Sequence, residues 1–275
     1  MTISDAHPDM NRQLEFFPTR NKNPKKLTPD QIEHFNKWGY IFPLDVFSQE
    51  EAETNRAYFE DLMHKASKAG HNNYSINGWH VHCKGIYSLL YEPRILDYVE
   101  DLIGPNIISI MTHFFSKEPH DKKQVSWHQD ASYWPLTPSK VITVWLAIDD
   151  VNEHNGPMTV IPGSHIHGQI PFENSSKEEN NVLGQSVHNP EGWGKSKVPF
   201  TLRSGQISIH TDLLLHGSET NRSNRRRCGL TLRYMPPDVR TTNPDEALCY
   251  ICRGADTKGY WKNSPTPSGE YIPNQ

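Results

Sequence analysis

The chain has 275 residues, of which 35% are hydrophobic and 22% are charged, and its formal net charge is -4 at pH 7. This balance, without an extended basic stretch, argues against nucleic acid and against an anionic membrane surface as partners. The first twenty residues carry Asp5, Asp9 and Glu15 where a secretory signal would need an apolar run. The longest apolar run, residues 141–148, is far too short to cross a bilayer. We expect a cytoplasmic, single-domain protein, and nothing in the sequence indicates a homo-oligomer.

The first third of the chain carries three helix signals. A capping box with a first-turn proline, Thr28-Pro29-Asp30-Gln31, predicts a short helix that ends at Gly39. A second capping box over residues 48–51 begins a longer helix that ends near residue 70. A third helix is expected over residues 94–102, before Gly104-Pro105. Residues 1–105 are therefore predicted to form a mostly helical flank on the outside of a sheet.

From residue 106 the sequence has the composition of short strands, because branched and aromatic residues dominate. The expected strands are residues 107–115, 125–127, 141–148, 158–161, 206–210 and 228–234. Turn signals at residues 155–157 and 162–164 separate them, and the polar stretch 173–196 is expected to be a mobile loop. Helices followed by strands indicate an α+β chain, mainly β, with a sandwich or barrel core over residues 106–240 and a C-terminal extension over 241–275.

The four cysteines are too few and too scattered for a disulfide framework, which favours a reducing compartment. They are Cys83, Cys228, Cys249 and Cys252. The last two have the spacing of a zinc or redox motif, but no second pair accompanies them. We interpret them as ordinary thiols.

A metal site is suggested by Trp127-His128-Gln129-Asp130. His128 and Asp130 are two residues apart and so project from the same face of a strand. His216, just beyond a strand far downstream, is the candidate third ligand. Two histidines and one carboxylate leave coordination positions open, which suits an iron(II) enzyme that binds cosubstrate and O₂. Zinc usually prefers a closed or nearly closed tetrahedron.

A candidate anion-binding pair lies close to the third ligand in sequence. Arg227 follows His216 by eleven residues, and its planar fork can hold the distal carboxylate of a dicarboxylate, with Ser218 as a hydroxyl donor. The alternative interpretation of Arg225-Arg226-Arg227 is a solvated basic turn, which is expected for one or two of the three. The strand register by itself leaves open which arginine points inward.

Further motifs accompany these residues along nearly the whole chain. They are Leu27-Thr28-Pro29 with Gly39-Tyr40, Lys117, Asn155-Gly156-Pro157, Ile161-Pro162-Gly163-Ser164-His165, and His216-Gly217-Ser218 with Asn221. In this combination the sequence resembles the phytanoyl-CoA dioxygenase family of iron(II) and 2-oxoglutarate oxygenases.

The resemblance implies a fold, a ligand set and a reaction. The fold is a double-stranded β-helix, a cupin-like jelly roll with the metal in its mouth, in which residues 155–157 and 162–164 are turns rather than catalytic loops. The resemblance implies that His128, Asp130 and His216 bind Fe(II), that Arg227 and Ser218 hold 2-oxoglutarate, and that Trp134 flanks it, with O₂ as the second cosubstrate. Halogenating relatives replace the metal carboxylate by a small residue, so the presence of Asp130 implies hydroxylation. Gln206 departs from the aspartate of many members, at a turn position.

Residues outside the motifs are expected to select the substrate. The candidates are Asn73, Tyr74, His80, His82, Lys84, His113 and Tyr133. Their donors and positive charge suit an anionic group such as phosphonate or carboxylate, and the alternative for residues 72–84 is a hydrated surface hairpin with incidental histidines. Trp79, Tyr133 and Trp134 are candidates for an aromatic cage around an amine.

Among compact bacterial family members, the chain resembles those that hydroxylate the carbon next to phosphorus in 2-aminoethylphosphonate or its N-methylated analogue. A hydroxylase of an amino acid, a compatible solute or a secondary metabolite is the alternative within the same chemistry. Two hypotheses from other classes are a barrel that binds metal or a small ligand without turnover, and a zinc hydrolase that uses the same ligands.

Overall fold

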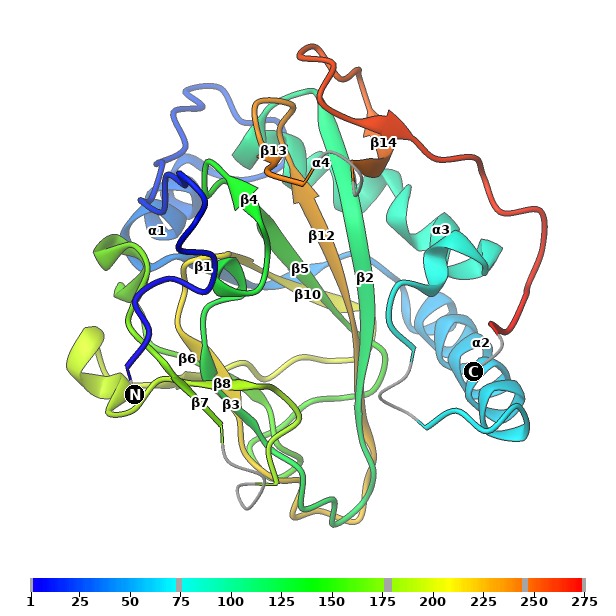
Figure 1. The fold of residues 1–275 in the computed structure, drawn as a ribbon. Helices are drawn as coiled ribbons and strands as arrows, with labels where there is room; N and C mark the ends of the chain where they lie inside the picture. The colour runs from blue at the N-terminus through cyan, green and yellow to red at the C-terminus, as the bar shows by residue number, and fades with distance from the viewer. Residues whose placement is uncertain (1, 73–75, 176–179, 244–246, 274–275) are drawn as a thin grey trace.

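The computed structural model describes residues 2–72, 76–175, 180–243 and 247–273. Strands β3, β6, β7 and β8 group at the lower left of Figure 1, while β2, β5, β10 and β12 cross its middle. Apart from β7 and β8, which pair with each other, these strands belong to two main sheets of seven and four strands. The two main sheets face each other across a cavity lined by both. No helix in the described part of the chain is long and apolar enough to cross a bilayer.

The seven-stranded sheet is antiparallel except for its last pair. Its strands in spatial order are β1 (Tyr40–Asp45), β10 (Gln206–Thr211), β5 (Ile142–Ala147), β12 (Arg227–Met235), β2 (Ile107–Lys117), β14 (Leu248–Arg253) and β15 (Lys262–Asn263). The four-stranded sheet contains β3 (Val125–His128), β11 (His216–Ser218), β6 (Met158–Val160) and β9 (Val198–Pro199). Two small ribbons pair β4 (Leu136–Thr137) with β13 (Arg240–Thr241), and β7 (Glu173–Asn174) with β8 (Gln185–Ser186). All six predicted strands are confirmed to within one or two residues.

The three predicted helices are confirmed as α1 (Pro29–Trp38), α2 (Gln49–Lys68) and α4 (Pro93–Ile103). In α1 the Thr28 hydroxyl accepts from the Gln31 backbone N–H and the Gln31 side chain accepts from that of Thr28, at 3.2 and 2.9 Å. Such reciprocal bonds satisfy two of the donors that every helix leaves open at its start. The 3₁₀ turns are η1 (Trp79–Val81), η2 (Asp130–Ser132), η3 (Ser164–His167) and η5 (Pro190–Trp193).

Helix α3 (Lys84–Leu90) and strand β1 are among the elements that were not predicted from the sequence. Helix α3 has no side-chain cap, so it depends on burying Ile86, Leu89 and Leu90. Strand β1 contains Pro43, which is tolerated because β1 lies at the edge of its sheet and bulges there.

Two segments contain regular elements that were not predicted from the sequence. Residues 173–196 were expected to be a mobile loop, and their described part contains β7, β8 and η5. Short polar strands of two residues lack a hydrophobic alternation that a sequence pattern can detect. The segment 241–275, expected to be an extension, adds β14 and β15 to the large sheet.

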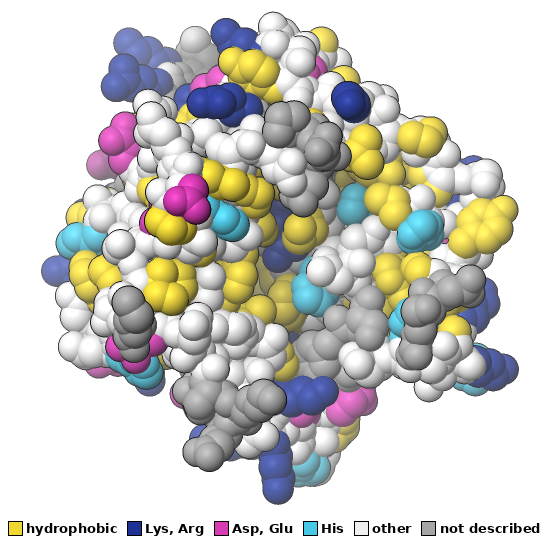
Figure 2. All heavy atoms as spheres, in the orientation of Figure 1, with side chains coloured by type: hydrophobic (Ala, Val, Ile, Leu, Met, Phe, Trp, Pro, Cys, Tyr) yellow, Lys and Arg dark blue, Asp and Glu magenta, His cyan; other side chains and the backbone are white. Residues whose placement is uncertain are grey.

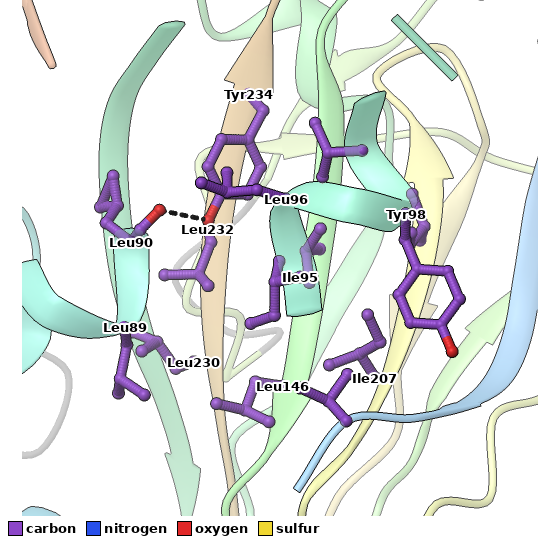
Figure 3. Packing of buried hydrophobic residues seen from close by; sticks show 14 of the residues in the cluster. Leu89, Leu90, Ile95, Leu96, Tyr98, Leu146, Ile207, Leu230, Leu232 and Tyr234 are labelled. Atoms are coloured by element: carbon purple, nitrogen blue, oxygen red, sulfur yellow. Dashed lines mark hydrogen bonds between the residues drawn. The ribbon is translucent and has the colours of Figure 1, made fainter. Parts of the chain in front are cut away.

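The main apolar core lies between the helices and the outer face of the large sheet (Figure 3). Alternate residues of β12, including Leu230, Leu232 and Tyr234, pack there against Leu90 and Ile95 from α3 and α4. The Tyr234 hydroxyl donates to the Leu90 carbonyl at 3.0 Å, so this buried polar group is satisfied. Because side chains alternate along a strand, the remaining residues of β12 face the cavity between the sheets.

Candidate metal centre and cosubstrate pocket

The small sheet brings together the three predicted metal ligands. His128 ends β3, His216 begins β11, and the two are direct partners in the ladder. Asp130 follows at the start of η2. One ligand atom from each residue lies within 4.8 Å of the others, and all three side chains are buried. Asp130 Oδ1 lies 3.7 Å from His128 Nε2 and 4.0 Å from His216 Nε2.

Hydrogen bonds fix the orientation of both imidazoles. Nδ1 of His128 lies 2.8 Å from the Ser126 carbonyl, and Nδ1 of His216 lies 2.9 Å from the Leu214 carbonyl. Because a carbonyl oxygen only accepts, Nδ1 carries the proton and Nε2 keeps its lone pair for a metal. Burial, together with the neighbouring His128 and His210, holds the pKa of His216 well below its usual range, so this ligand is neutral.

The two oxygens of the Asp130 carboxylate have different neighbours. Burial by itself would raise the pKa of Asp130, but His128, His210, Arg233 and His216 together hold it well below its usual value. Oδ2 accepts from the Thr143 hydroxyl at 2.7 Å, which leaves Oδ1 facing the two histidines. Two imidazoles and one ionised carboxylate, with positions left for other ligands, fit iron(II).

His210 is a fourth cavity residue that the sequence analysis did not assign. It lies on β10, with Nε2 3.7 Å from Asp130 Oδ2 and its ring centroid 4.7 Å from that of His216. The sequence signal for it was weak, because a lone histidine in an apolar strand is more often structural than functional.

Arg227 is the arginine of the triplet that faces the cavity. Its side chain is buried, with Nε and Nη2 donating to the Gly156 carbonyl at 3.0 and 2.7 Å and Nη2 lying 3.4 Å from Ser218 Oγ. Arg225 and Arg226 instead pair with Asp150 and Asp149 on the other side of the strand end. The turn that contains Gly156 therefore also supports Arg227, which the sequence analysis did not foresee.

Lys117 lies beside Arg227 as its partner in the ladder with β2. Its Nζ donates to the Ser218 hydroxyl at 2.8 Å and to the carbonyls of Ser218 and Glu219. Burial and the adjacent Arg227 lower the pKa of Lys117 to about 6. Lys117 therefore orients Ser218, a role that its presence in a family motif did not specify.

The aromatic wall next to Arg227 is Trp145, whose ring centroid lies 5.8 Å from the guanidinium. Trp134, predicted to flank the cosubstrate, is not among the residues that line this cavity; it packs in a separate cluster under Arg233. The contact of Trp134 with the cosubstrate therefore stays a prediction, because proximity in sequence to Asp130 does not determine which wall a side chain joins.

Arg233 is the second arginine that lines the cavity. It is buried, and its guanidinium lies over the Trp134 ring at 5.2 Å. Burial lowers its pKa, although Asp130 acts in the opposite direction. Figure 2 shows a hollow on this face of the molecule, with Lys or Arg atoms at its depth and His side chains near its rim.

The predicted substrate residues lie in different places. Asn73 and Tyr74 lie outside the described residues. His80 is buried, is hydrogen-bonded to Thr112 at 3.0 Å and packs against Tyr250, so it is an interior residue and residues 76–84 are not a hydrated surface hairpin. His82 and Lys84 are exposed.

His113 and Tyr133 lie nearer the metal ligands. The half-buried His113 ring lies 4.0 Å from that of Phe115, a cavity residue, and Tyr133 meets His128 edge-on at 5.7 Å. The predicted aromatic cage does not form, because Trp79 belongs to the helix-side core and Trp134 to another cluster.

The sequence profile of the phytanoyl-CoA dioxygenase (PhyH) family matches residues 25–229. The chain therefore belongs to this family of iron(II) and 2-oxoglutarate oxygenases, which confirms the resemblance read from its motifs.

Individual relatives agree with this family. Peroxisomal phytanoyl-CoA dioxygenase of Homo sapiens is 31% identical over 152 residues, which cover 53% of this chain and 44% of that protein. A probable alpha-ketoglutarate-dependent hypophosphite dioxygenase of Stutzerimonas stutzeri is 28% identical over 167 residues, which cover 58% of this chain and 56% of that protein. The chain thus spans about half the length of these curated relatives.

Among solved structures, the apo form of the non-heme monooxygenase ThoJ superposes with a TM-score of 0.75 at 26% identity. The superposition covers 86% of this chain and 88% of that one. Together with the sheet order, this similarity confirms the predicted jelly-roll fold.

Proposed function

We propose that the protein is an Fe(II)- and 2-oxoglutarate-dependent dioxygenase that hydroxylates a C–H bond of a small acidic substrate. The observation that carries this proposal is the buried His128, Asp130 and His216 triad, with a buried Arg227 and Ser218 on the same cavity. A metal-binding barrel without turnover would need the triad, but it would not need a carboxylate clamp beside it. A zinc hydrolase that uses the same ligands would not need this carboxylate clamp either.

The residues divide the work between metal and cosubstrate. His128, Asp130 and His216 would hold iron, which when bound supplies the oxidising chemistry with O₂ and 2-oxoglutarate. Thr143 keeps Asp130 turned toward the histidines by occupying Oδ2. Arg227 and Ser218 would grip the distal carboxylate of 2-oxoglutarate, because a guanidinium fork and a hydroxyl match its two oxygens.

Apolar side chains of the cavity wall would limit water at the reacting centre. Phe115, Trp145 and Met158 give the space around the triad a mainly apolar lining. A dry site keeps the charged groups strongly coupled and protects the cosubstrate from unproductive oxidation. Holding the target C–H bond beside the metal then accounts for a large part of the rate.

The preferred substrate is 2-aminoethylphosphonate or its N-methylated analogue, hydroxylated at the carbon next to phosphorus. Two features support a phosphorus oxyanion. One relative is named as a probable hypophosphite dioxygenase, and the cavity carries a second buried arginine, Arg233. Amino acids, compatible solutes and secondary metabolites with an acid group are the alternatives that the test must separate.

The test is succinate formation by the iron(II)-loaded protein under air with 2-oxoglutarate, across aminoalkylphosphonates, amino acids and betaines, with product masses recorded. Substrate-dependent succinate with a gain of one oxygen atom on 2-aminoethylphosphonate is the expected result. The same result with an amino acid or betaine would support the proposed reaction and identify a different substrate. Absence of succinate with every compound would refute the proposal, and turnover without O₂ would favour the zinc hydrolase.

Matched histidine variants tie the reaction to the site. His128→Ala and His216→Ala should lose bound iron and succinate formation together, because each removes a ligand. His154→Ala is the control, since that side chain is exposed and only its backbone is hydrogen-bonded within the described structure. Normal turnover in either cavity variant would exclude the assigned metal centre.

A further inference from the structure

A row of three polar residues crosses the inner face of the large sheet. Thr143 on β5 is the direct partner of His210 on β10 and of Arg233 on β12. Neighbouring strands lie about 4.8 Å apart, so His210 and Arg233 flank Thr143 on either side. Thr143 in turn holds Oδ2 of Asp130, which places the whole row beside the metal ligands.

The two outer members of the row have buried nitrogen atoms without a hydrogen-bond partner. Nε and Nη1 of Arg233, and both ring nitrogens of His210, are buried and have no hydrogen-bond partner in the part of the chain that the structure describes. Arg233 is 5% exposed and His210 is 1% exposed, and both side chains line the cavity. Buried polar groups are nearly always satisfied, because leaving a donor dry costs free energy. The Arg233 donors, with one N–H of His210 beside them, therefore indicate a missing acceptor in the cavity.

The formal charges of the cavity show the sign of that acceptor. Apart from histidines, the titratable residues among its described lining are Asp130, Arg227 and Arg233. Iron(II) with Asp130 would carry one net positive charge, which the metal-bound carboxylate of 2-oxoglutarate would neutralise, and Arg227 would pair with the distal carboxylate. Arg233 would remain a buried charge without a counter-ion, and such charges are normally paired.

Arg233 also lies away from the cosubstrate clamp. Arg227 and Arg233 are six residues apart on one face of β12, which is roughly 20 Å along the strand. The clamp with Ser218 and Lys117 is complete at the Arg227 end. The Arg233 end of β12 is therefore not part of this clamp.

We infer that Arg233, with His210 as a second donor, binds the acid group of the substrate, a phosphonate or a carboxylate. This inference rests on the proposed function and deepens it, because it names the residue pair that would select an anionic substrate. A planar guanidinium can donate two parallel hydrogen bonds to either kind of oxyanion. The row would then hold the acid group beside the metal and leave the neighbouring carbon as the target.

The test is binding rather than turnover. Protein loaded with Mn(II) and 2-oxoglutarate in place of the reactive iron is titrated by calorimetry with two acids and their uncharged counterparts. The pairs are 2-aminoethylphosphonate with its diethyl ester, and β-alanine with its amide. At least one acid should bind the wild type more tightly than its counterpart, and the pair that discriminates more strongly identifies the oxyanion.

Arg233→Met should weaken binding of that acid by about 30-fold or more, the effect of removing one partner of a buried charge pair. The methionine keeps an unbranched side chain over Trp134, and Arg233→Lys, which keeps the charge, should recover part of the affinity. His210→Asn should give a smaller loss. Arg225→Gln is the charge control, because Arg225 is exposed and pairs with Asp150, and its effect should stay within about twofold.

The affinity for 2-oxoglutarate serves as the internal reference for each variant. If Arg233→Met weakens the binding of 2-oxoglutarate as much as the binding of the substrate acid, Arg233 belongs to the cosubstrate site and the inference is wrong. If neither acid binds wild-type protein better than its uncharged counterpart, the inference is also wrong, while tight 2-oxoglutarate binding would leave the proposed function intact. If the wild-type protein binds neither the metal nor 2-oxoglutarate, the proposed function itself is refuted.

Discussion

Gly229→Ala tests the packing of the cosubstrate wall. Gly229 lies on the inner face of β12 between Arg227 and Thr231, opposite Ala147 of β5. A Cβ atom at this position would lie 2.0 Å from Cζ2 and 2.3 Å from Cε2 of Trp145, far inside the ordinary contact distance, which begins at 3.4 Å. The indole must therefore move by about 1.4 Å or more to admit one methyl group.

This displacement has a cost in stability and a cost in binding. Overpacking a well-filled interior destabilises a protein by about 1–3 kcal/mol. Trp145 also lies next to Arg227. Moving the indole should therefore weaken the binding of 2-oxoglutarate by about tenfold, equivalent to about 1.4 kcal/mol. Thermal unfolding and calorimetric titration with 2-oxoglutarate on the Mn(II) protein measure the two effects separately.

Gly184→Ala is the matched control, since nothing lies within 4 Å of its added Cβ and its φ lies outside the left-handed region. It should change the free energy of unfolding by less than about 0.5 kcal/mol. Gly229→Ala combined with Trp145→Phe should regain stability, because the smaller ring relieves the overlap. Wild-type stability and 2-oxoglutarate affinity in Gly229→Ala alone would refute the described packing of Trp145 on β12.

Three further predictions concern the clamp, a buried carboxylate and a buried histidine. Arg227→Gln should weaken 2-oxoglutarate binding by about 30-fold or more, whereas Arg225→Gln should not, and equal effects in calorimetry would contradict the assigned register. The carboxylate of Asp101 accepts hydrogen bonds from the backbone N–H groups of Lys25, Lys26 and Leu27. Asp101→Ala should therefore lower the free energy of unfolding, measured by urea titration, by about 3 kcal/mol or more. A loss below about 1 kcal/mol would show that Asp101 does not hold this segment. Burial, with a contribution from His82, lowers the pKa of His80 from 6.5 to about 4. The folded state therefore binds fewer protons than the unfolded state between these values, and stability should fall with decreasing pH by up to about 1.4 kcal/mol per unit. His80→Gln should have a shallower slope in that window, and parallel curves would argue against a buried neutral His80.

Local sequence signals determined most of the secondary structure and the metal triad. The capping boxes at Thr28 and Ser48 predict α1 and α2 because they involve residues only three apart. His128 and Asp130 could be paired from sequence because they are two residues apart within one short family motif. His216 needed the motif as well, since a ligand far downstream has no local relation to the other two.

Only the tertiary structure decided the rest of the cavity. Whether Arg227 or a neighbour faces inward depends on how β12 pairs with β2 and β5, and a shift of one residue would reverse every side chain. The row of His210, Thr143 and Arg233 comes from three strands that are distant in sequence. For the same reason Trp145, rather than Trp134, forms the wall beside Arg227. Short-range patterns specify which residues can form a strand, whereas strand pairing across long separations specifies which of them meet.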